Sequence, residues 1–164
     1  MEVTKHDSML AWVSLVHAST YLISELDGHL RDQAGISLPE HDLLSQLDKV
    51  GGEVMLSELA RRVYLSKAGM TKMVDRLEKA GQVERVRPGV DRRVTSAKLT
   101  TAGRATLDRS RPTLVAWVEA NLRNHLSDEQ VISLRDSLQA LLEGHGRWEG
   151  QMRHLLGQAH DKTD

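Results

Sequence analysis

Residues 66–80 carry small, hydroxyl-bearing and basic side chains on one predicted face of a helix. Besides Asp75, that face shows Ala68, Gly69, Thr71, Lys72 and Arg76. The apolar residues fall on the opposite side of the helical wheel, where they must pack inward: Met70, Met73, Val74 and Leu77. Small residues let a backbone approach base edges, while hydroxyl, Lys and Arg groups bind phosphates or guanine acceptors. The pattern predicts a helix that enters the major groove of DNA.

The basic charge of the chain is concentrated around this helix. Residues 61–93 hold ten Lys or Arg against four acids, a net charge of +6, so the rest carries −7 within a formal total of −1. A basic module in an acidic chain is typical of a protein that presents one face to a polyanion. A solvated face of mixed charge is the other interpretation.

A helix and a hairpin are predicted on either side of the basic helix. Ser57 is expected to cap a positioning helix over about 57–63, and Ser66 to cap the recognition helix, which Gly81 ends. Two short strands, about 83–87 and 94–99, follow with a Pro-Gly turn between them. This order is that of a winged helix-turn-helix. Ser57, Ser66 and Lys67 complete the predicted DNA contacts of the helix pair.

The tip of the hairpin, the wing of this fold, is rich in arginine. Arg87, Arg92 and Arg93 stand where they would reach the DNA backbone or the minor groove. Asp91 is an acid among them. We expect it to pair with a nearby arginine and to fix the shape of the wing by orienting the guanidinium.

Amphipathic helices precede and follow the winged region. Helical spacing predicts a helix over residues 10–31, and the capping box Ser37–Glu40 opens a second, which ends at Gly51-Gly52. Thr100 or Thr101 opens a helix that crosses Pro112, and a capping box at 127–130 opens the last one. The predicted fold is mainly α (α+β), with a small three-stranded sheet. Residues 36–100 form the DNA-binding region, and residues 1–35 and 101–164 form a helical dimerisation region.

These flanking helices hold more apolar positions than a small winged domain can cover. A twofold homodimer would bury them. The predicted interface residues are Leu10, Trp117, Leu122, Trp148 and Leu155. Packing of the two tryptophans within one chain is the alternative.

Several other classes of protein find no support. With no cysteine the chain has no disulfide and no thiol-based sensor. No stretch approaching about 18 uncharged apolar residues is expected, so we place the protein in the cytoplasm. No catalytic motif or cofactor loop is evident, which predicts that the chain is not an enzyme and needs no cofactor.

Two alternative functions share the predicted fold. Eight histidines, with Glu40 next to His41, suggest a metal-responsive regulator, but no set of three or four ligands has metal-site spacing, so we predict no metal site. A winged helix that makes only protein contacts is the third interpretation, against which the exposed basic face argues.

Residues 56–103 resemble the DNA-binding core of the MarR family (multiple antibiotic resistance regulators). Leu59-Ala60 matches the positioning helix, and Val74 to Gly81 matches the family's "VDRLE..G". Asp91 with Arg93 matches the wing motif Asp-x-Arg, which implies that these two residues pair and stabilise the wing. Leu99 to Gly103 matches "LT..G". There are two departures: Ala68-Gly69 replaces a common Ser-Thr, and Gln82 replaces an aliphatic residue.

The resemblance implies a transcription regulator, which we expect to be a repressor, that binds double-stranded DNA as a homodimer. One recognition helix per subunit requires a palindromic operator with half-sites about one helical turn apart. The resemblance also implies release by a small phenolic or anionic effector. Relatives line their effector pockets at positions that match Trp12, His17 and Tyr21 on the first helix and His41 at the start of the second.

Overall fold

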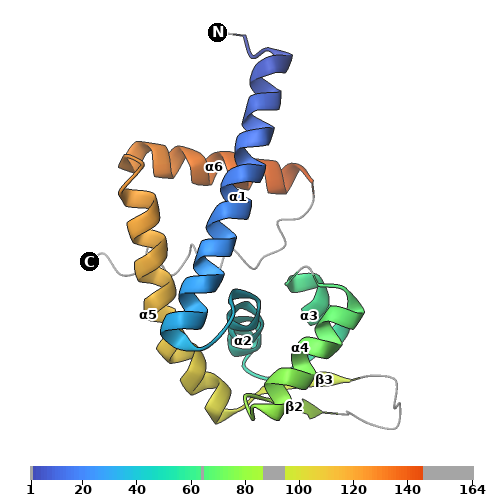
Figure 1. The fold of residues 1–164 in the computed structure, drawn as a ribbon. Helices are drawn as coiled ribbons and strands as arrows, with labels where there is room; N and C mark the ends of the chain where they lie inside the picture. The colour runs from blue at the N-terminus through green and yellow to red at the C-terminus, as the bar shows by residue number, and fades with distance from the viewer. Residues whose placement is uncertain (1, 64, 87–94, 146–164) are drawn as a thin grey trace, which may run out of the picture. The chain divides into compact units, whose positions relative to one another are not determined.

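The structure, a computed structural model, describes residues 2–63, 65–86 and 95–145 (Figure 1). Six helices and three strands follow one another in these ranges: α1 (Lys5–Ala34), α2 (Leu38–Val50), β1 (Glu53–Met55), α3 (Leu56–Arg62), α4 (Lys67–Lys79), β2 (Val83–Val86), β3 (Ser96–Leu99), α5 (Thr101–Arg123) and α6 (Asp128–Gly144). The predicted mainly helical fold with a small sheet is confirmed. The chain divides into two compact units, residues 1–117 and 118–164.

The three strands form one antiparallel sheet in the order β1-β3-β2. Val54 of β1 lies opposite Ala97 of β3, and Val83 of β2 lies opposite Leu99. The pairing of β2 with β3 is the predicted hairpin. Its tip, with Arg87, Asp91, Arg92 and Arg93, lies outside the described residues, as do Trp148 and Leu155.

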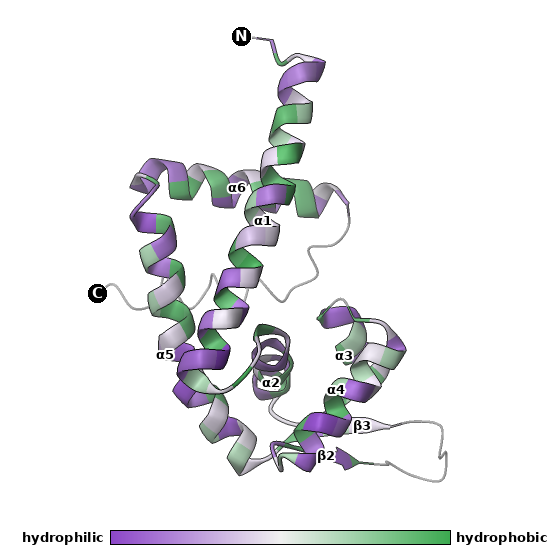
Figure 2. Ribbon diagram, in the orientation of Figure 1, coloured by the Kyte–Doolittle hydropathy of each residue, from purple (hydrophilic) through white to green (hydrophobic). Residues whose placement is uncertain are grey.

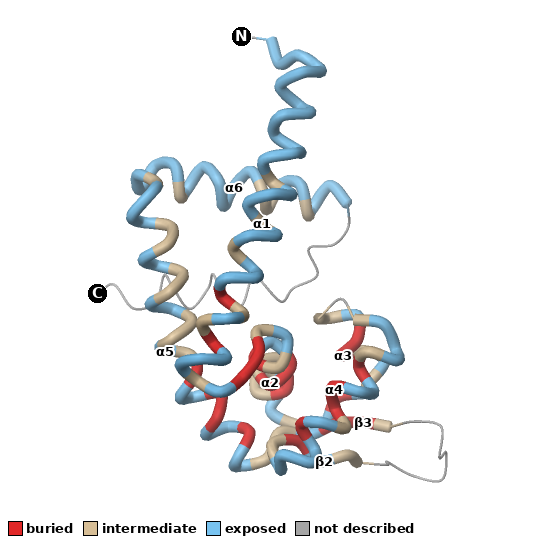
Figure 3. Tube along the Cα trace, viewed as in Figure 1, coloured by how far each residue is buried: buried red, intermediate tan, exposed pale blue. Residues whose placement is uncertain are grey.

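One hydrophobic core joins the sheet to α2, α3 and α4 (Figure 3). Its members are buried apolar residues from these elements, from α5 and from the connection before α2: Ile36, Leu43, Leu44, Leu47, Val54, Leu59, Ala60, Met70, Met73, Val74, Leu77, Val83, Ala97 and Leu107. The four apolar residues predicted to face inward from the recognition helix are all among them. Leu59 and Ala60 of the positioning helix are buried as well.

Most predicted helix ends are confirmed, with two exceptions. The first helix spans Lys5–Ala34 and is longer than the predicted range 10–31, because Thr4 and Asp7 form a capping box and Gly35 ends the helix with a positive φ. The Ser37–Glu40 and Ser127–Gln130 capping boxes form, Ser66 caps α4, and Gly51 and Gly81 have the positive φ expected at a helix end. The prediction that Ser57 caps the third helix is wrong. That helix begins one residue earlier, at Leu56, whose backbone N–H donates to the carbonyl of Thr95 at 3.0 Å, so a neighbouring strand segment replaces the side-chain cap.

The start of α5 is tied to the turn that follows α4. The Thr100 hydroxyl donates to the Gly81 carbonyl at 2.7 Å and accepts from the Gly103 N–H at 3.0 Å, so it caps the helix. Gly103 is buried against this turn, and a Cβ there would overlap the carbonyl oxygen of Gln82. This close approach explains the glycine of the "LT..G" motif. The helix then continues through Pro112.

Helix α1 contains many hydrophobic residues, as the green bands in Figure 2 show, and most of the helix is exposed (Figure 3). Only Leu26 and Leu30 of this helix are buried, whereas Trp12 is 62% and Tyr21 63% exposed. By length and composition, α1 is apolar enough to cross a membrane. The expectation that no such stretch exists was therefore wrong: Ser, Thr and His interrupt the apolar residues but carry no charge. In the second unit, α6 has no buried residue and exposes Ile132, Leu134 and Leu141.

Gly103→Ala is expected to lower the free energy of unfolding by about 1–3 kcal/mol, because the new Cβ must push the Gln82 carbonyl out of place. The matched control is Gly28→Ala in α1, where a Cβ meets nothing within 4 Å and helix propensity favours alanine. Denaturant unfolding at a fixed protein concentration measures both variants. A Gly103→Ala protein as stable as Gly28→Ala would contradict the steric explanation.

Candidate nucleic-acid interface

Helix α4 turns its predicted DNA-reading face to solvent. Ala68, Thr71, Lys72 and Arg76 are exposed and Gly69 is half-buried, whereas the opposite face lies in the core. The Ser66 hydroxyl accepts from the Gly69 N–H at 3.1 Å, so this hydroxyl serves the helix cap. The first turn of the helix thereby keeps its small residues at the surface.

An open groove of about 390 Å³ lies beside the N-terminus of α4. Ser57, Lys67 and Thr71, all predicted DNA contacts, line it together with Thr95. Met55, Leu56 and Met70 complete its wall. The groove thus unites predicted contacts from α3 and α4 with the segment that enters β3.

The predicted contacts differ in whether their polar groups are free. Lys67 and Lys72 pair with no acid in the part of the chain that the structure describes. In contrast, the Thr71 hydroxyl donates to the Lys67 carbonyl at 3.0 Å, and Arg76 Nε lies 2.6 Å from Glu40 Oε1. Arg76 remains 61% exposed, so its guanidinium is shared between Glu40 and solvent.

Arg85 of β2 was not predicted as a functional residue and entered the sequence analysis only through the net charge of residues 61–93. Its Nη1 lies 2.5 Å from Asp75 and 2.8 Å from Glu78, and its Nη2 donates to the Thr71 carbonyl at 3.2 Å. Arg85 thus ties the wing strand to α4 and neutralises two acids of the recognition helix. The sequence offered one signal for this contact: Asp75 and Glu78 are three positions apart, so they share one face of a helix that is followed by a strand carrying Arg85.

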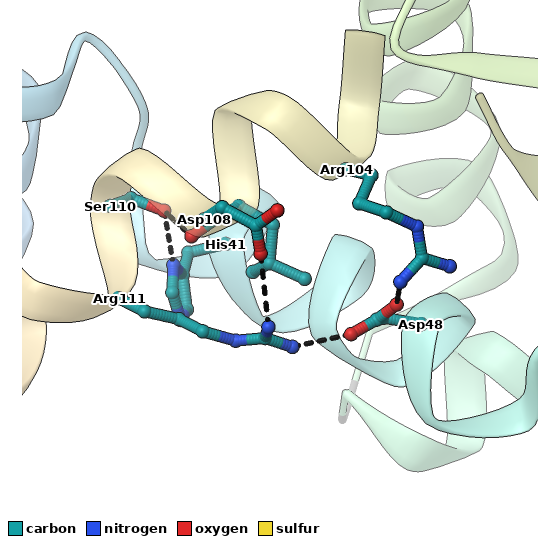
Figure 4. Close-up of polar contacts among 7 residues, drawn as sticks. His41, Asp48, Arg104, Asp108, Ser110 and Arg111 are labelled. Atoms are coloured by element: carbon teal, nitrogen blue, oxygen red, sulfur yellow. Dashed lines mark hydrogen bonds and ion pairs between the residues drawn. The ribbon is translucent and has the colours of Figure 1, made fainter. Parts of the chain in front are cut away.

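The residues predicted to line an effector pocket have different environments. Trp12, His17 and Tyr21 are exposed on α1, whereas His41 is only 5% exposed. His41 Nδ1 lies 2.8 Å from the Ser110 hydroxyl, which itself donates to the Leu107 carbonyl at 3.0 Å (Figure 4). Because Ser110 uses its proton there, we assign the His41 proton to Nδ1.

The electrostatics around His41 favour a neutral ring. Burial, reinforced by the positive charges of Arg111 and Lys49, lowers the pKa of His41 to about 4. Arg111 is itself held by Asp48, at 2.5 Å, and Arg104 binds the other oxygen of the same carboxylate (Figure 4). Polar contacts thus join α2 to α5 at both ends of α2.

The carboxyl of Glu40 is held in its charged form. Burial by itself would raise its pKa, but hydrogen bonds from Ser37 and the nearby Arg76 hold the pKa below its usual value. Among the residues that the structure describes, no three His, Asp or Glu side chains gather as a metal site would require.

The predicted dimer residues within the described ranges are not part of the core. Leu10 is 52% exposed, and Trp117 and Leu122 are half-buried.

The helix pair α3–α4, the three-stranded sheet and the basic exposed face define a winged helix-turn-helix protein. The MarR family profile matches residues 34–94. Sco3205, a MarR family transcriptional regulator of Streptomyces coelicolor solved in complex with DNA, is 30% identical, with a TM-score of 0.77 over 88% of this chain and 91% of that chain. NadR, solved in complex with 4-hydroxyphenylacetate, is 26% identical, with a TM-score of 0.63 over 86% of this chain and 96% of that chain.

The chain belongs to the MarR family. The HTH-type transcriptional regulator YdgJ of Bacillus subtilis is 30% identical over 96 residues, which are 58% of each chain, so this match spans less than two thirds of that relative. These relatives are transcriptional regulators, in agreement with the prediction that the chain is not an enzyme.

The neutral His41 predicts a pH-dependent stability. Since its pKa falls from 6.5 in the unfolded chain to about 4 in the fold, the unfolded state binds more protons between these values. The free energy of unfolding therefore falls as the pH is lowered from 6.5 to 4, by up to about 3 kcal/mol from this group. Denaturant unfolding as a function of pH measures the effect.

His41→Asn keeps a donor near the Nδ1 position and removes the titration, so its stability is expected to change less over this range. His125→Asn, at an exposed position, is the control. If His41→Asn and the wild type have the same slope between pH 6.5 and 4, the neutral ring is not the cause.

Proposed function

We propose that the protein is a cytoplasmic repressor that binds a palindromic operator as a homodimer. A small phenolic or anionic ligand releases it from the operator. In this proposal α4 enters the major groove, and the arginines of the wing tip contact the backbone or the minor groove. Residues 36–100 serve as the DNA-binding region, and residues 1–35 and 101–164 as the dimerisation region. Double-stranded DNA and a second copy of the chain are its partners, and it has no membrane partner.

The observation that carries the proposal is the exposed face of α4, which lies beside an open groove and carries two lysines without an acid partner in the described residues. Lys67 lines the groove, and Lys72 lies on the same helix with no acid partner in the described part of the chain. Each phosphate that such a lysine neutralises releases counterions and adds affinity. The complex of Sco3205 with DNA supports the same use of this fold.

The dimer is supported by apolar side chains that each unit leaves uncovered. Exposed apolar residues in the first unit include Met9, Leu10, Trp12, Val13, Ile23 and Val115, and in the second Ile132, Leu134 and Leu141. Burial in a twofold interface removes them from water at about 25 cal/mol per Å². It also accounts for the apolar character of α1 without a membrane.

The proposed effector class is supported by the aromatic side chains on α1 and by NadR, whose solved complex contains 4-hydroxyphenylacetate. Trp12 and Tyr21 offer exposed aromatic faces, and His17 offers a titratable donor on the same helix. A metal-responsive regulator of the same fold is the second candidate, motivated by the eight histidines. Zinc titration against a chelator distinguishes the two.

DNA recognition is tested with duplexes that the protein selects from a random pool. Lys72→Ala is expected to change the preference among these duplexes, since a good base contact contributes about 1–3 kcal/mol of discrimination. Arg93→Ala is expected to weaken binding to all of them by loosening the wing. Fluorescence anisotropy at several salt concentrations measures both effects, with Lys5→Ala at the start of α1 as the control.

Equal and uniform losses in both variants would show that the roles are divided differently. Affinity that does not fall with salt would favour a winged helix used for protein contacts only. The footprint is expected to show two half-sites about one helical turn apart.

The dimer is tested with a charge in the apolar face of α1. Leu10→Glu is expected to shift the protein toward the monomer, because the carboxylate cannot be buried without a partner. Light scattering during size-exclusion chromatography measures the mass, and operator affinity is expected to fall in parallel. Glu25→Gln, at an exposed charged position of the same helix, is the control. A monomeric wild type that still protects both half-sites would overturn the dimer.

A further inference from the structure

The first turn of α2 contacts three other helices through three residues that lie within four positions. The Leu38 N–H donates to Asp27 Oδ1 of α1 at 2.8 Å. Glu40 Oε1 lies 2.6 Å from Arg76 Nε of α4, and His41 Nδ1 donates to the Ser110 hydroxyl of α5 at 2.8 Å. The first turn of α2 is thus bonded to the recognition helix α4 and to the long helices α1 and α5.

Glu40 is the fixed partner in its pair with Arg76. Its Oε2 accepts from the Ser37 N–H at 2.9 Å and from the Ser37 hydroxyl at 2.5 Å, so the carboxylate is part of the helix cap. The side chain of Glu40 is 12% exposed, against 61% for Arg76. Moving Glu40 would break the cap, whereas the arginine can turn toward solvent at little cost. Arg76 is therefore the member of the pair that a DNA phosphate can draw away.

His41 and Asp48 keep α2 in register with α5. His41 is buried against Ser110 at the start of α2, and Asp48 binds Arg104 and Arg111 near its end (Figure 4). Two separate attachments prevent α2 from rotating or sliding along α5 on its own. A displacement of α5 is thus carried into the turn that holds Glu40.

We propose that the first turn of α2 is the junction that couples the recognition helix to α1 and α5, with Glu40 as the positioning residue for Arg76. The proposal rests on the proposed DNA-binding function. When a phosphate draws Arg76 away, Glu40 loses its ionic partner, and the change reaches His41 one residue further on. Because coupling free energies are reciprocal, a change at the α1 and α5 contacts alters the position of Arg76 in turn.

The junction is tested by following His41 while DNA binds at α4. The probe is the pair of imidazole ¹⁵N resonances of His41 in the full chain, assigned by their loss in His41→Asn, and the ligand is a duplex that the wild type selected from a random pool. In the wild type these resonances are expected to shift on addition of the duplex. In Glu40→Gln they are expected to stay in place although the duplex is bound, because glutamine preserves the capping box and removes only the charge that holds Arg76.

The matched control is Glu58→Gln, which breaks the Glu58–Arg62 pair of α3 and changes the net charge by the same amount. Both substitutions add the same long-range attraction to DNA, but only Glu40→Gln is expected to abolish the His41 response. A wild type that binds no duplex overturns the proposed function. A wild type that binds without any His41 shift, or a Glu40→Gln protein that retains the shift, overturns the junction.

A second measurement approaches the junction from α5. Ser110→Ala removes the partner of His41 and lies on a different helix from every proposed DNA contact. We expect it to weaken operator binding about threefold or more in the wild-type background. The same substitution is expected to have no effect in the Glu40→Gln background, and thermal unfolding verifies that each protein is folded at the temperature of the assay. Equal losses in both backgrounds overturn the coupling.

Discussion

The burial of one face of α4 is the constraint on which the candidate interface depends. Met70, Met73, Val74 and Leu77 pack into the core with α2, α3 and the sheet. At 3.6 residues per turn, this packing directs the intervening positions outward, so the helix cannot rotate to present another face without exposing four large side chains. The polar surface that remains is therefore held in a fixed orientation by apolar contacts that never meet DNA.

Carboxylates decide how much of the basic charge is available at that surface. The segment 61–93 has a net charge of +6, but two of its arginines pair with acids outside it, Arg62 with Glu58 and Arg76 with Glu40. Arg85 is used to hold the wing strand on α4. The count of charges in a segment thus overstates the charge that can meet a phosphate, because ion pairs form between parts of the chain that lie far apart in sequence.

Polar contacts of α2 link the winged region to the long helices α1 and α5. Asp27, Glu40, His41 and Asp48 each join α2 to a different neighbour or hold it at a different place. Helix α1, in contrast, leaves most of its apolar residues uncovered within one chain. The polar contacts are thus completed within one chain, whereas the apolar face of α1 is the surface that the proposed dimer would bury.

Features that depend on residues three or four positions apart could be predicted from the sequence. The two predicted capping boxes, the Ser66 cap, the glycine helix ends and the inward face of α4 are of this kind, because hydrogen bonds and helical periodicity act locally. The winged helix-turn-helix followed from their order. The sequence by itself thus determined the elements, their faces and the fold class.

Only the tertiary structure decided which polar groups remain free. On α5, Ser110 lies 69 residues from His41, and Arg104 and Arg111 lie 56 and 63 residues from Asp48. The cap of α3 is a backbone hydrogen bond from Leu56 to Thr95. No local sequence pattern predicts these contacts. Ser57 was given the wrong structural role for this reason, and Arg76 acquired a partner that its spacing did not suggest. Such contacts are set by how the elements pack, which is a property of the whole core and not of any one segment.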